Sequence, residues 1–122
     1  MSQTVMTLQT RLKNLADEFK AISSVIHHYK RVETSAPFGV WCEQFETNSD
    51  FADNTKTTQG VSVQLDYYTQ EEFDGVIDSL QAYLNEHGFP WNLDSVQFED
   101  DTNLIHYSWS FTVYGEAISQ RS

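Results

Sequence analysis

The residues of this chain that could do chemistry are two neighbouring histidines, one cysteine and many carboxylates. His27 and His28 lie in the stretch 24–30, whose β-branched and aromatic residues predict a short strand. Side chains alternate along a strand, so the two imidazoles would point to opposite faces and could not chelate one metal ion. We therefore expect packing or hydrogen-bonding roles for both histidines, and no metal site.

Cys42 is the only cysteine, which excludes an intrachain disulfide and a thiolate metal cluster within one subunit. No pattern of His and Asn marks it as a nucleophile, so we interpret it as a small buried hydrophobic residue. The chain has no phosphate-binding glycine loop, nucleophile elbow, paired zinc histidines or dinucleotide fingerprint. The acidic run 99–101 lacks the alternating oxygen ligands of a calcium loop. We expect no enzyme and no cofactor.

The elements that position these residues are organised around the stretch 57–90. Alternating apolar residues predict a strand over 58–68, and Thr69 with Glu72 could form a capping box that starts a helix. Gly88 and Pro90 would end this helix. Its apolar stripe is Phe73, Val76, Ile77, Leu80 and Leu84, and we expect it to pack on the strand face that carries Val61, Val63 and Leu65.

The other segments complete an α+β fold. Apolar spacing predicts a helix over 5–22 with Thr4 as N-cap, and strands follow at 24–30 and 38–45. The second of these strands is apolar on both faces, which suggests a central strand or an interface. A hairpin is predicted from 91–99 and 104–113. The expected order is α-β-β-β-α-β-β, a mostly antiparallel sheet of about five strands covered by two helices. We expect one domain over 1–122, with 1–4 and 115–122 flexible.

The charge of the chain is unevenly distributed. Residues 1–31 contain five Lys and Arg against two acids, a net of +3, whereas residues 32–122 contain two against sixteen, a net of −14, for a total of −11. This acidity disfavours duplex binding, and the oppositely charged parts could pair between subunits. The alternative is that the acids only keep the protein soluble. No apolar run could span a bilayer, so we expect a soluble protein with no membrane partner.

A polar segment, 46–58, is longer than packing needs and holds one aromatic residue, Phe51. Loops often carry binding residues, so the stretch 51–54 is a candidate contact segment. The alternative is a disordered solvent loop.

Several short stretches together resemble the tail-terminator, or tail completion, proteins of long-tailed bacteriophages and prophages of Gram-positive bacteria. The likeness covers about 25–113 and is carried by Ile26-His-His-Tyr-Lys30, Ala36-Pro-Phe-Gly-Val40, Phe51-Ala-Asp-Asn54, the start of the helix at 67–72, and Thr102-Asn-Leu-Ile-His-Tyr-Ser-Trp109. Asn103 stands where a glycine is common in the family, and it also tolerates a left-handed backbone.

This resemblance implies a structural virion protein. It would form a ring, with six copies in the family, that caps the tail-tube protein and meets the head connector or stopper protein at the head-proximal end of the tail, after assembly in the host cytoplasm. Genome DNA would pass through without specific binding. Candidate subunit or tube contacts are Phe51, Asp53, Asn54, Lys56, Trp41, Lys30 and Arg31, and candidate lumen residues are Asp50, Asp53, Asp100 and Asp101. The alternative is a small acidic DNA mimic that occupies a basic groove of a host or nuclease protein.

Overall fold

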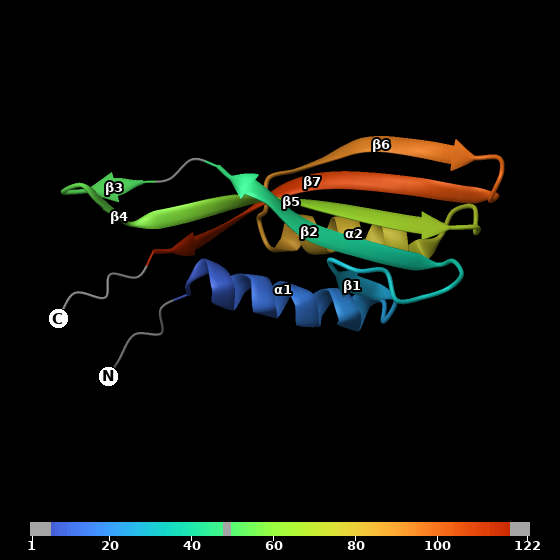
Figure 1. Cartoon of the computed structure of the whole chain (residues 1–122), viewed down its shortest axis with the longest axis horizontal. Coiled ribbons are helices and arrows are strands. Elements are labelled where there is room, and N and C mark those ends of the chain that lie inside the picture. Colours follow the sequence, from blue (N-terminus) through green and yellow to red (C-terminus); the bar gives the residue numbers. More distant parts are fainter. Residues whose placement is uncertain (1–5, 48–49, 118–122) are drawn as a thin grey trace.

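The computed structural model describes residues 6–47 and 50–117, and its helices and strands follow the expected α+β order (Figure 1). A five-stranded sheet carries the fold, and a separate two-stranded hairpin projects beyond one end of it. The elements are α1 (Leu8–Ile22), β1 (Ile26–His28), β2 (Phe38–Glu46), β3 (Phe51–Ala52), β4 (Thr55–Lys56), β5 (Thr58–Thr69), α2 (Gly75–Glu86), β6 (Trp91–Glu99) and β7 (Leu104–Glu116).

The sheet has the strand order β1-β2-β5-β7-β6. All neighbouring strands are antiparallel except β1 and β2, which are parallel. The predicted hairpin is confirmed as β6 and β7, and Asn103 at its tip has the left-handed φ of 59° that its side chain tolerates. β1 and β6 are therefore the two outer strands of the sheet.

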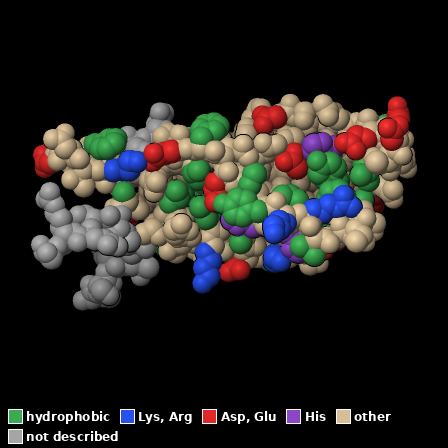
Figure 2. Space-filling model, viewed as in Figure 1, with side chains coloured by type: hydrophobic (Ala, Val, Ile, Leu, Met, Phe, Trp, Pro, Cys, Tyr) green, Lys and Arg blue, Asp and Glu red, His purple; other side chains and the backbone are tan. Residues whose placement is uncertain are grey.

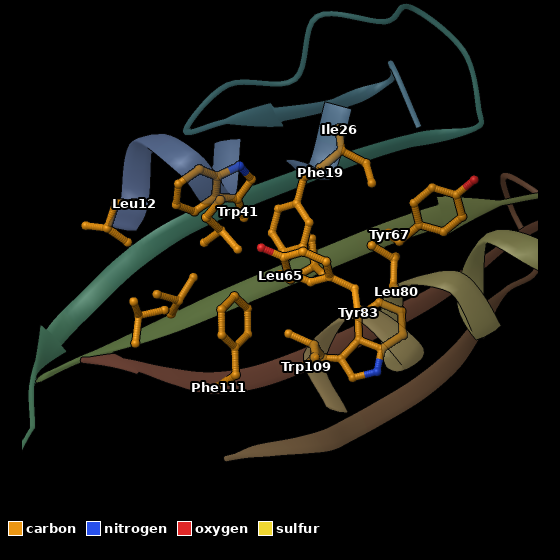
Figure 3. Packing of buried hydrophobic residues seen from close by; sticks show 14 of the residues in the cluster. Leu12, Phe19, Ile26, Trp41, Leu65, Tyr67, Leu80, Tyr83, Trp109 and Phe111 are labelled. Atoms are coloured by element: carbon orange, nitrogen blue, oxygen red, sulfur yellow. The ribbon is translucent and has the colours of Figure 1, made fainter. Parts of the chain in front are cut away.

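Both helices contribute to one hydrophobic core on one face of the sheet. Cross-strand register lines up the buried residues Trp41, Leu65 and Trp109 on that face. Phe19 of α1 lies at the centre, with its ring centroid 5.9 Å from Trp41 and 5.4 Å from Tyr83 of α2 (Figure 3). The predicted stripe of α2 is confirmed for Leu80 and Leu84, which are fully buried, and for Val76 and Ile77, which pack against the core at its margin.

The start of α2 differs from the expectation. β5 continues through Thr69, which pairs with Ile105, and the Thr69 hydroxyl accepts from the backbone of Glu71. The N-cap is Asp74, whose carboxylate accepts from the backbone N–H of Val76 at 2.9 Å and from the hydroxyl of Tyr67 at 3.2 Å. Thr69, which the capping box would need, is thus part of the sheet, and the N-cap of the helix lies five residues later, at Asp74.

Phe73 is consequently not part of the buried stripe. It precedes the N-cap in the turn, with φ +60°, and its side chain is 90% exposed. A positive φ is unfavourable for a bulky residue, so the turn is held by its surroundings and not by this residue's own preference.

The two ends of the described chain pack together. α1 starts at Leu8 with Thr7 as N-cap, whereas the expected cap, Thr4, lies outside the described residues. β7 runs on to Glu116, whose N–H donates to the carbonyl of Met6, so the expectation of a flexible segment is wrong for 115–116. Gly115 permits this approach, because a Cβ there would lie 2.6 Å from the Cα of Leu8. Residues 1–4 and 118–122 of the expected flexible ends are not among the described residues.

Candidate assembly surfaces

The segment expected to be a contact loop forms a hairpin that projects from the molecule. β3 and β4 pair with each other, and in Figure 1 they extend along the long axis beyond the five-stranded sheet. Asp53 and Asn54 form the two-residue turn with φ values of 52° and 64°, the left-handed region that such turns require. We call residues 50–57 the arm.

Side chains at the base of the arm hold its direction. The Lys56 ammonium lies 2.6 Å from a carboxylate oxygen of Glu46 on β2 and 5.9 Å from the ring centroid of Phe51. The backbone carbonyl of Asp50 accepts from the N–H of Thr57 at 2.7 Å, and its carboxylate accepts from the Thr58 hydroxyl at 2.9 Å. Phe51 remains 64% exposed, so the arm presents an aromatic side chain away from the core.

The other candidate contact residues separate into two groups. The prediction that Trp41 is an interface residue is wrong. Trp41 is 1% exposed and packs edge-on against Phe19, because it lies on the face of β2 that faces the core. Cys42, on the opposite face, is only half-buried, which corrects the expectation of a buried thiol. Lys30 and Arg31 are both exposed, just after the outer strand β1.

The candidate lumen acids lie in two separate places. Asp50 and Asp53 belong to the arm, and Asp100 and Asp101 belong to the exposed tip of the β6–β7 hairpin. Figure 1 shows the arm and this tip at opposite ends of the long axis. The four carboxylates therefore form two pairs and not one cluster.

A ladder of stacked groups crosses the face of the sheet that the helices do not cover. The Arg31 guanidinium lies 4.0 Å above the ring of Phe38, which stacks on Tyr68 at 4.6 Å. Tyr68 stacks in turn on His106, whose Nε2 lies 2.8 Å from a carboxylate oxygen of Asp66. The ladder borders a cavity of about 450 Å³. Burial, with the nearby acids, raises the pKa of the Tyr68 hydroxyl, so this group stays neutral.

Each histidine of β1 has its own carboxylate partner. His27 Nε2 lies 3.0 Å from Glu33, whereas His28 Nε2 contacts Glu43, which also accepts from the Tyr29 hydroxyl at 2.7 Å. Burial opposes the ionisation of Glu43, but the hydrogen bonds from Tyr29 and His28 outweigh it and lower its pKa. Within residues 6–47 and 50–117 no three His, Cys, Asp or Glu side chains gather as metal ligands would.

Several apolar residues are exposed although the sequence does not predict it. Leu93, Val96 and Phe98 on β6, and Tyr29 and Val32 after β1, are all solvent-exposed. Periodicity alone does not tell which strand is outermost, so no signal in the sequence could have found the first three. The exposure of Phe73 could have been predicted from the Asp74-Gly75 pair, since Asp is a strong N-cap residue and Asp74 competes with Thr69 for that position.

No protein-family model matches this chain, and no curated protein sequence is significantly similar to it. In the part of the chain that the structure describes, neither helix is long and apolar enough to cross a membrane.

Proposed function

We propose that this chain is a non-catalytic structural subunit of a long-tailed bacteriophage, which forms a ring at the head-proximal end of the tail. The ring caps the tail-tube protein, joins it to the head connector or stopper protein, and lets genome DNA pass. The observation that carries the proposal is the arm, a structured hairpin that turns its aromatic residue away from the core of its own subunit.

The arm fits an assembly role for a physical reason. A two-stranded hairpin alone is only marginally stable in water, and covering an exposed aromatic side chain on a partner would stabilise it. The contact between Lys56 and Glu46 holds the base of the arm against β2 and so reduces the entropy lost on docking. Aromatic residues concentrate at the centres of protein interfaces, and Phe51 is the aromatic residue of the arm.

Phe51→Ala tests this role. Because Phe51 is 64% exposed, the variant should keep the thermal unfolding midpoint of the wild type. It should reduce capping of purified tail tubes, counted by negative-stain electron microscopy as rings at tube ends. Phe73→Ala is the matched control, since it removes another exposed phenylalanine that lies outside the arm. Equal capping by wild type and Phe51→Ala would remove the arm from the proposal, and absence of rings with and without tube protein would refute the function.

The acidic pairs support a further element of this proposal, a lumen along which DNA slides without sticking. Carboxylates give phosphates no counterion release and hence no binding. Both pairs can line one lumen only if the long axis of the subunit follows the ring axis, because they lie at its opposite ends.

Reversing the charge of one pair at a time tests where the lumen lies. Rings of the Asp50→Lys, Asp53→Lys variant should be compared with wild-type rings for retention of duplex DNA at low salt. The Asp100→Lys, Asp101→Lys variant enters the same comparison only where it still forms rings, since loss of the ring would assign this pair to a subunit contact instead of the lumen. A pair that faces the lumen should retain DNA and slow its ejection when reversed. If neither reversed ring binds DNA or delays ejection, these acids only solubilise the surface.

The alternative function is a DNA mimic. It is favoured by the stretch 57–117, which contains eleven Asp and Glu and no Lys or Arg. A mimic should bind one basic nuclease or host protein stoichiometrically, in a complex that salt dissociates, and should form no rings. Sedimentation of the purified chain alone separates the two functions.

A further inference from the structure

The outer strand β6 leaves a row of apolar side chains uncovered. Leu93, Val96 and Phe98 are 38%, 51% and 58% exposed, and they point to the helix side of the sheet, where Leu93 pairs with the buried Trp109 of β7. The helix layer therefore stops short of β6. We call this strand with its apolar row the β6 edge.

Acidic residues lie on this strand and beyond its end. Asp94 lies at the bulge within β6, where it accepts a hydrogen bond from Ser110 on the face away from the apolar row. Glu99 ends the strand, and Asp100 and Asp101 lie at the exposed tip beyond it. No Lys or Arg occurs in the stretch 71–101. Charges and bulges on an outer strand oppose uncontrolled strand pairing. The β6 edge of one copy therefore resists pairing with the β6 edge of another copy.

The opposite edge of the sheet has the same apolar character and the opposite charge. Directly after β1, Tyr29 and Val32 are 60% and 63% exposed, and Lys30 and Arg31 lie between them. Lys30 is exposed, whereas the Arg31 guanidinium is held over the Phe38 ring and donates to the carbonyls of Glu33 and Thr34. The carboxylate of Glu33 is paired with His27. Lys20 of α1 adds a third cation, with its Nζ 3.2 Å from Nδ1 of His27 on β1. We call this surface the β1 edge. In the right half of Figure 2, most Lys and Arg side chains lie toward the α1–β1 side and most Asp and Glu side chains toward β6, and an acidic side chain also lies at the α1 side.

We propose that the β6 edge of one copy docks on the β1 edge of the next copy. A symmetric contact between two β6 edges would cover the apolar rows but would bring acids against acids. A head-to-tail contact covers apolar residues on both sides and pairs acids with cations, and repeated copies of such a contact make a ring where the rotation closes. The occupant of the β6 edge is therefore a second copy of this chain.

The dimensions show how far the contact must extend. A nine-residue strand spans about 30 Å at roughly 3.4 Å per residue. A standard interface of roughly 800 Å² per partner would then be about 27 Å wide, so the contact must include residues of the elements beside β6 as well as the strand itself. This inference rests on the proposed ring function and names the two surfaces that would build the ring.

Directed cross-linking tests the orientation of the contact. In a Cys42→Ser background, Val96→Cys and Val32→Cys are prepared as two separate proteins and joined with a short bis-maleimide. A head-to-tail contact predicts a covalent dimer only in the mixture of the two proteins, and ladders from the chain that carries both cysteines. Covalent dimers of Val96→Cys alone would show a symmetric contact and overturn the proposal.

Charge exchange tests the chemistry of the contact. Salt alone does not separate the effects, since it screens both the attraction between edges and the repulsion between chains of net charge −11. Lys30→Glu with Arg31→Glu, and Asp100→Lys with Asp101→Lys, should each shift the sedimentation coefficient from the ring to the monomer. The chain with all four changes should recover the ring, because the complementarity is restored. Asp50→Lys with Asp53→Lys is the matched control, with the same charge change as the second pair but at the other end of the molecule.

The outcomes distinguish this inference from the proposed function. Rings that survive both single-edge reversals would refute the edge contact and leave the ring function intact. A wild-type chain that stays monomeric with and without tube protein would refute both. Far-ultraviolet circular dichroism of every variant verifies that a loss of assembly is not a loss of fold.

Discussion

A comparison of Leu80 with Phe73 tests where α2 begins, because the sequence pattern expects both side chains to be buried. Leu80 is fully buried among the core residues (Figure 3), and truncation to Ala removes three carbon atoms. At about 0.8 kcal/mol per buried carbon, the lost transfer free energy is about 2.4 kcal/mol. A residual cavity of about 50 Å³ at about 24 cal/mol per Å³ adds about 1 kcal/mol, so Leu80→Ala should cost roughly 3–4 kcal/mol.

Phe73→Ala is the informative comparison, because the sequence pattern assigns both residues to one buried stripe. In the structure Phe73 is 90% exposed, and both Phe and Ala are equally disfavoured at its φ of +60°. The free energy of unfolding should therefore change by less than about 0.5 kcal/mol, as for other surface substitutions. Phe73→Gly should stabilise the protein by up to about 1 kcal/mol, since glycine adopts a positive φ without strain.

Urea unfolding followed by tryptophan fluorescence measures these differences, since Trp41 and Trp109 are buried in the core. With a slope of about 1–3 kcal/mol per molar urea, Leu80→Ala should lower the midpoint by about 1 M or more at an unchanged slope. A Phe73→Ala variant as unstable as Leu80→Ala would refute the exposed turn and restore a helix that starts at Thr69. An unchanged Leu80→Ala midpoint would refute the packing of α2 on the sheet.

Three further predictions concern the cap, the chain ends and pH. Asp74→Ala should cost about 1–2 kcal/mol through the lost N-cap, and circular dichroism melts measure this loss. Gly115→Ala should destabilise by about 1–3 kcal/mol through its clash with Leu8, while Gly75→Ala, with no atom within 4 Å of the added Cβ, should be neutral or slightly stabilising in the same melts. Burial and Asp74 raise the pKa of the Tyr67 hydroxyl, and burial also raises the pKa of Tyr83, so the unfolded chain loses these protons first. The free energy of unfolding should therefore fall as the pH rises above about 10. Tyr67→Phe should remove part of that fall in urea titrations at about pH 8–11, and an unchanged slope would contradict the assignment.

Most of the fold could be predicted because local and long-range preferences agree. β5 and β7 alternate cleanly between core residues and polar residues, and their pairing in register follows from that alternation. α1 has an unbroken apolar stripe, so only its first turn was placed differently. Where the pattern and the sheet compete, as at Thr69, the cross-strand pairing with Ile105 overrides the local capping signal.

The assembly surfaces could be predicted only in part, because exposure depends on which strand is outermost. The arm was indicated by its length and by Phe51, but its strands are two residues each and leave no periodic signal. Trp41 and Phe98 are both aromatic residues on predicted strands, yet Trp41 is buried on the inner strand β2 and Phe98 is exposed on the outer strand β6. Only the strand order distinguishes them, and strand order is a long-range property.

The position of the arm relative to the two edges determines what it can contact. The β1 and β6 edges lie on the two sides of the sheet, whereas the arm extends beyond one end of it along the strand direction (Figure 1). If neighbouring copies meet through the sides, the strands of all copies lie side by side and every arm projects from the same end face of the ring. An arm in that position is directed at whatever stacks on the ring. On this geometry Phe51 would contact the tail tube or the head connector and the two edges alone would hold the ring, so Phe51→Ala should reduce capping while leaving isolated rings intact.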